Sequence, residues 1–149
     1  MSMELHVCWH GELAVDSVKL KNALDALGFD AIVQYDDFDT AEGFWPIEIA
    51  GLKTGVEIQH EDDLQELSEL YPVLATALDG RDKGVTFIWH GDSAECGTGL
   101  AFAAALGGLT DVIIYEPSEG VILSSARCAE DGRQMFEDAK KEQQGPTPG

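Results

Sequence analysis

Basic residues are scarce in this 149-residue chain, which holds 9 lysines and arginines against 28 aspartates and glutamates and has a formal net charge of −19. A chain with this balance is repelled at long range by nucleic acid and by anionic lipid, and it attracts cationic partners. We therefore expect neither nucleic acid nor a membrane as its partner. High negative charge also serves solubility alone, and this explanation stays open at this point.

Cysteines and long apolar runs are scarce as well. The three cysteines (Cys8, Cys96 and Cys128) are scattered and form no Cys-x-x-Cys pair, which favours reduced thiols over a disulfide framework or a zinc site. No apolar run approaches the roughly 20 residues that span a bilayer. The first residues, "MSMELHVCWHGE", lack the basic start and apolar core of a secretory signal. We therefore expect a cytoplasmic protein.

Apolar residues make up 44% of the chain, which is ordinary for a globular protein. This length and composition predict a single domain over residues 1–142. The last residues, 143–149, read "QQGPTPG" and are predicted to form a disordered tail.

Hydrophobic periodicity predicts strands and helices that alternate along the domain. Apolar alternation indicates a β-hairpin over 44–59, and Pro72 is expected to bend or split a helix over 61–80. We expect the remaining strands at 3–10, 31–35, 84–90, 111–117 and 121–125, and the remaining helices at 14–28, 93–108 and 128–142. The predicted fold class is α+β, with a mixed or antiparallel sheet and helices on one face.

An internal repeat explains the motif Trp-His-Gly, which occurs at 9–11 and again at 89–91. An offset of 80 aligns residues 8–37 with 88–117 without a gap, and eight of these thirty positions are identical. Chance would give about two identities. We interpret the chain as two related β-α-β-β units. In each unit the tryptophan ends an inward-facing strand, and the glycine permits a sharp turn of the backbone out of that strand.

Motifs for catalysis, metal binding and phosphate binding are weak. His6 and His10 share a strand face but lie about 13 Å apart, too far for one metal ion. The glycines of "GDSAECGTG" fall inside a predicted helix and lack the lysine of a phosphate loop. We therefore expect no catalytic residue, metal or cofactor. Two alternatives stay open: a small hydrolase or transferase that uses Cys96 with His90, and a regulatory domain with a small ligand in the sheet–helix crevice.

The acidic residues gather in the middle of the chain. Between Asn22 and Gly80 there are fourteen acidic residues, and Lys53 is the only basic one. Aromatic residues lie among them, a mixture typical of interfaces that have an aromatic centre and a charged rim. The aromatic rings could equally be core residues. The predicted partner-binding set is Asp36, Asp37, Phe38, Asp39, Glu42, Phe44, Trp45, Glu48, Glu57, Glu61, Asp62, Asp63 and Glu66.

Two segments resemble a known family. "GFWPIEIAGLKTGVEI" (43–58) and "GLTDVIIYEPSEGVILS" (108–124) are similar to segments of immunity proteins of bacterial polymorphic and type VI secretion toxin systems. The resemblance implies a small cytoplasmic, non-enzymatic protein of interbacterial competition that binds and neutralises a cognate toxin. Such a toxin would act in the cytoplasm, for example as a nuclease or an NAD- or ADP-ribose-directed enzyme. The family's contact residues vary too much to transfer to positions of this chain.

Overall fold

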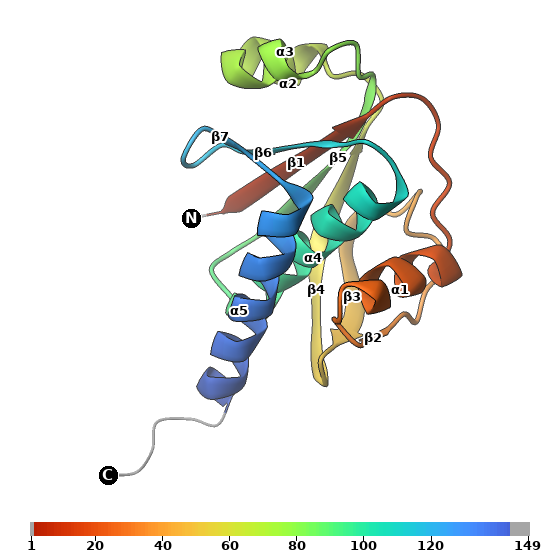
Figure 1. Ribbon diagram of the computed structural model, residues 1–149, viewed down its shortest axis with the longest axis vertical. Helices are drawn as coiled ribbons and strands as arrows, with labels where there is room; N and C mark the ends of the chain where they lie inside the picture. The colour runs from red at the N-terminus through yellow and green to blue at the C-terminus, as the bar shows by residue number, and fades with distance from the viewer. Residues whose placement is uncertain (1, 144–149) are drawn as a thin grey trace.

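The computed structural model describes residues 2–143 and shows one seven-stranded sheet with five helices (Figure 1). The strand order is β2-β3-β4-β5-β1-β6-β7, and every neighbouring pair is antiparallel. In chain order the elements are β1 (Met3–Trp9), α1 (Ser17–Ala26), β2 (Ala31–Ile32), β3 (Gly43–Ile49), β4 (Leu52–Glu61), α2 (Gln65–Leu70), α3 (Pro72–Ala77), β5 (Lys83–Trp89), α4 (Ser93–Leu109), β6 (Ile113–Glu116), β7 (Val121–Leu123) and α5 (Ser125–Gln143).

The α+β class and an antiparallel sheet are confirmed. Helices α1, α4 and α5 cover one face of the sheet, as expected (Figure 1). The short helices α2 and α3 differ from the expectation, because their leucines pack with Cys8 and Tyr115 on the opposite face. Pro72 separates these two helices and is the first residue of α3, where its missing N–H costs no hydrogen bond. Of the predicted tail, residue 143 belongs to α5, and 144–149 lie outside the described residues.

The central pair of strands follows the sequence repeat. His6 of β1 lies opposite Thr86 of β5, and these two positions are themselves 80 residues apart. The two antiparallel strands are therefore related by a local twofold axis at this pair. The order of elements also repeats, as β1-α1-β2-β3 and as β5-α4-β6-β7. Trp9 and Trp89 end their strands on the buried side, and Gly11 and Gly91 follow with positive φ angles of 72° and 94°.

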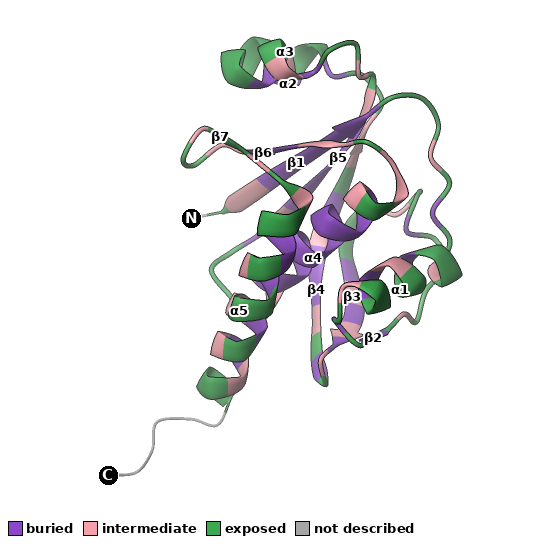
Figure 2. Ribbon diagram, in the orientation of Figure 1, coloured by how far each residue is buried: buried purple, intermediate pink, exposed green. Residues whose placement is uncertain are grey.

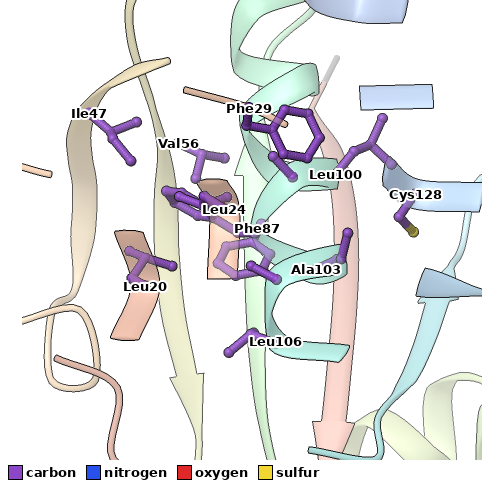
Figure 3. Packing of buried hydrophobic residues seen from close by; sticks show 14 of the residues in the cluster. Leu20, Leu24, Phe29, Ile47, Val56, Phe87, Leu100, Ala103, Leu106 and Cys128 are labelled. Carbon is purple, nitrogen blue, oxygen red and sulfur yellow. The ribbon is translucent and has the colours of Figure 1, made fainter. Parts of the chain in front are cut away.

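Helix α4 lies at the centre of the helical layer. It packs against the sheet and against both α1 and α5, and its residues from Gly97 to Leu106 are all buried (Figure 2). Small residues allow this close packing: a Cβ atom at Gly99 would lie 2.9 Å from the Trp89 ring, and one at Gly97 would lie 3.1 Å from the Phe136 ring. Figure 3 shows Ala103 and Leu106 of α4 near Phe87 of the sheet, and Leu100 nearer to Phe29.

Candidate functional site

The sheet has a second face, which the three large helices leave uncovered. Along β3 and β4, the buried residues Trp45, Ile47, Val56 and Ile58 point toward the helices. Their neighbours in the sequence must point the other way because side chains alternate along a strand. We call the opposite side of β3, β4, β5 and β1 the outer face, with the outward residues Phe44, Glu48, Lys53, Glu57, Gln59, Thr86, Ile88, Glu4 and His6.

One row of outer-face side chains crosses four strands. Phe44 lies opposite Glu57, which lies opposite Ile88, which lies opposite Glu4. Phe44 is 56% exposed, yet its ring has a defined place over Gly55, since a Cβ atom there would lie 2.5 Å from Phe44 Cζ. An aromatic ring over a strand glycine stabilises the pairing of its strands. The outer face thus presents an ordered aromatic side chain beside carboxylates.

The adjacent row holds a buried polar chain. His6 Nδ1 lies 2.8 Å from Thr86 Oγ1, and the Thr86 hydroxyl lies 3.5 Å from Glu61 Oε1, to which it donates. Burial lowers the pKa of His6, and this effect exceeds the opposing effect of the nearby Glu4 carboxylate. Burial also raises the pKa of Glu61, although the bonds from Thr86 and Gln59 act against the shift. At neutral pH His6 is therefore uncharged and lies between two carboxylates.

The predicted partner-binding residues occupy more than one surface. Phe44, Glu48 and Glu57 lie on the outer face, and Glu61 and Glu66 line a cleft at its border with α2. The acidic loop before β3 lies toward the helical side instead, since Asp39 borders a cavity there with Trp9 and Leu106. The set therefore extends from the outer face to the helical side, and Glu61, which borders both cavities, lies where the two surfaces meet.

Several of the predicted carboxylates have local structural roles. Asp36 accepts a hydrogen bond from the Ser17 N–H, and Asp63 accepts one from the Gln65 N–H. Glu42 accepts one from the His60 N–H at 3.3 Å. Within residues 2–143, basic side chains neutralise few members of the set: Asp62 lies 3.8 Å from Lys83, and Glu57 lies 3.7 Å from His90. The negative charge of both surfaces therefore remains open to a partner.

Two aromatic members of the set belong to the core. Phe38 and Trp45 are only 2% and 3% exposed, and their rings meet edge to face at a centroid distance of 5.4 Å. Trp45 Nε1 donates to Asp37 Oδ1 at 2.9 Å, which ties the acidic loop to β3. Their prediction as partner-binding side chains is corrected, because a ring enclosed by the core offers no contact area. Phe44 is the aromatic side chain that reaches the surface.

Sequence reasoning missed part of the outer face: Glu4, His6, Gln59, Tyr71, Thr86 and Ile88. A signal exists in "MELHVCW", where Glu4 and His6 alternate with the apolar Leu5 and Val7. This alternation places two polar side chains on one face of an otherwise apolar strand. The contribution of Tyr71 has no comparable signal, because it depends on how α2 folds back over the sheet.

The geometry does not support the alternative with Cys96 and His90. Burial raises the pKa of the Cys96 thiol to about 11, and the nearby Asp131 and Glu116 add to this shift. His90 lies beside Glu57 on the outer side, whereas Cys96 borders a groove formed with β7 and α5. A nucleophilic thiolate needs a lowered pKa and an adjacent base.

Three other kinds of feature can be examined in the described residues: a small-ligand pocket, a metal site and a membrane-spanning helix. On the helical side, the crevice between Trp9, Leu13 and Phe38 has a volume of about 90 Å³, below the roughly 300 Å³ at which ligand pockets begin. The groove that Trp89 and Leu100 form with β7 and α5 has a volume of about 330 Å³, which is large enough for a small ligand. Residues 2–143 contain no group of three or more metal-ligating side chains placed to hold one ion. No helix in that range combines the length and apolar character needed to cross a bilayer. Comparisons with protein-family models, curated proteins and solved structures found no match.

Proposed function

We propose that this chain is a non-catalytic binding protein that neutralises a basic protein, and that its outer face is the binding surface. The observation that carries this proposal is a sheet face left open by α1, α4 and α5, on which the exposed, ordered Phe44 lies directly opposite Glu57, with Glu48 further along its own strand and Glu4 in the same cross-strand row. An aromatic centre with carboxylates around it suits a partner that has basic side chains around an apolar pocket.

The charge of the whole chain supports the same partner. A net charge of −19 accelerates the approach of a cationic protein and opposes that of acidic ones. The resemblance of 43–58 to immunity proteins falls on β3 and β4, the hairpin that supplies Phe44, Glu48 and Glu57. The partner we propose is therefore a toxin that acts in the cytoplasm, with a basic active-site cleft that this face occupies.

The test is a growth assay in a bacterial host that expresses the product of the gene adjacent to the one for this chain, which the proposal expects to be toxic. Co-expression of the wild-type chain should restore growth, and the outer-face variant Glu48→Lys/Glu57→Lys should not. Reversing two charges at a close interface costs several kcal/mol, or at least about 100-fold in affinity. The matched control is Glu130→Lys/Glu137→Lys, which changes the charge equally at two exposed positions of α5.

The control should protect the host as well as the wild type does, and circular dichroism should show that both variants are folded. Protection by the outer-face variant would overturn the proposal. Loss of protection in both variants would show that total charge matters and the outer face does not, which also overturns it.

A further inference from the structure

A cleft opens where α2 meets the outer face. It has a volume of about 220 Å³, and its apolar lining comes from Leu67 and Leu70 of α2 and from Ile88 of β5. Leu70 is 63% exposed, so this apolar lining reaches the surface. The same walls carry polar groups, from Glu4, His6, Gln59, Glu61, Glu66 and Thr86. A long side chain with an apolar stem and a polar head suits this mixed lining.

The inner end of the cleft has an unfilled position for a hydrogen-bond donor. His6 is 98% buried, and its Nε2 atom has no hydrogen-bond partner among the described residues. In the tautomer in which His6 Nδ1 donates to Thr86 and the Thr86 hydroxyl donates to Glu61, at 3.5 Å, Nε2 is an acceptor. Nε2 then lies 3.2 Å from another acceptor, Glu4 Oε2, and a donor that both can share would stabilise this arrangement.

The charge around this position specifies a cationic donor. Three carboxylates line the cleft, from Glu4, Glu61 and Glu66, and no lysine or arginine of residues 2–143 lines it. The Tyr71 ring forms part of the wall, with its centroid 5.5 Å from that of His6. We propose that the cleft receives an arginine side chain of a protein partner, whose guanidinium donates to Glu4 and His6 and faces Glu61 and Glu66.

An arginine fits better than a lysine for two reasons. The acceptors come from β1, β4 and α2 and so approach from several directions, which suits the five donors of a planar guanidinium. The Tyr71 ring can in addition stack on the guanidinium plane. This inference rests on the proposed function, because it identifies one anchor of the basic partner.

The direct test uses N-acetyl-arginine-methylamide, which represents an arginine within a chain, and follows the ring signals of His6 and Tyr71 by NMR. Saturable shifts of both rings are expected. The neutral isostere N-acetyl-citrulline-methylamide should bind at least about tenfold more weakly, because it lacks the charge that strengthens each hydrogen bond. Equal binding of the two compounds, or no binding of either, would overturn the inference.

The matched variants are Glu4→Gln and Glu130→Gln. In Glu4→Gln the new amide can donate to His6 Nε2 and fill the position itself, so arginine binding should fall at least about tenfold. Glu130 is exposed on α5, on the other side of the sheet from the cleft, and Glu130→Gln should leave the titration unchanged. Equal losses of affinity in both variants would show that the arginine compound responds to surface charge alone, and this would overturn the assignment of the cleft as its binding site. Unchanged backbone spectra establish that both variants are folded.

Two further compounds test the identity of the ligand. An N-acetyl-lysine-methylamide that binds as tightly as the arginine compound would overturn the assignment to arginine. Free L-arginine that binds more tightly than the blocked form would assign the cleft to the amino acid and overturn the partner side chain as its source. If the wild-type chain neutralises the toxin but the arginine compound does not bind, the inference about the cleft is wrong and the proposed function stands. If the arginine compound binds but the wild-type chain does not neutralise the toxin, the proposed partner is wrong.

Discussion

The two phenylalanines of the acidic segment should respond in opposite ways to truncation. Phe38 is 2% exposed, and its ring meets Trp45 and Phe102 edge to face at 5.4 and 5.3 Å. Truncation of such a ring costs about 3–5 kcal/mol, because it leaves a cavity and removes aromatic pairs. Phe44 is 56% exposed. Truncation of Phe44 should cost about 1 kcal/mol, roughly half of the value for a fully buried ring.

Urea unfolding followed by tryptophan fluorescence measures both effects. With a slope of about 2 kcal/mol per molar urea, Phe38→Ala should lower the midpoint by about 1.5–2.5 M, and Phe44→Ala by about 0.5 M. Binding should show the reverse order: Phe44→Ala weakens the complex at least about tenfold, and folded Phe38→Ala binds like the wild type. A small stability loss for Phe38→Ala combined with a large loss of binding would refute the division into core and surface.

Three further predictions test the packing and the titrating groups. Gly55→Ala should destabilise the protein by about 1–3 kcal/mol in urea unfolding, because the new Cβ atom would lie 2.6 Å from a backbone oxygen. The control is Gly108→Ala in α4, where the new Cβ atom meets nothing within 4 Å and the change should be neutral or stabilising. Burial lowers the pKa of His6 below its ordinary 6.5, so the unfolded chain takes up a proton at a higher pH than the folded one. The unfolding free energy should therefore fall as the pH drops below 6.5, and His6→Gln should reduce this slope; equal slopes would contradict the assignment. The thiol pKa values of Cys8, Cys96 and Cys128 are raised to about 11 or 12, chiefly by removal from solvent, so native protein at pH 8 should react with iodoacetamide at least about 100-fold more slowly than unfolded protein; equal rates would contradict the raised pKa values.

Local sequence signals predicted most of the elements. Apolar alternation gave the β3–β4 hairpin, and Pro72 marked the boundary between α2 and α3. Gly132 has a low helix propensity, yet α5 runs through it, because the missing side chain lets α5 approach Phe29 and the Gly97 carbonyl of α4. That gain depends on a tertiary contact, which a local pattern does not contain.

The site was harder to predict, because it depends on which side of the sheet each segment takes. The acidic residues are close in sequence, and this suggested one surface. The loop with Asp39 lies on the helical side, whereas Glu48 and Glu57 of the next two strands point outward. Phe38 and Phe44 are both aromatic residues in an acidic segment, and only strand register and loop path separate core from surface.

The sequence repeat and the proposed binding site draw on different parts of the chain. The repeated units supply the sheet centre, β1 and β5, and the helices α1 and α4 beside it. The second unit has no counterpart of β4, α2 and α3, since the chain continues there into α5. This unrepeated segment contributes Glu57, Glu61 and Tyr71, which complete the outer face and its cleft. Because β4 also contributes Leu52, Val56 and Ile58 to the core, only the outward side chains of the added segment, such as Glu57, can change binding at little cost in stability.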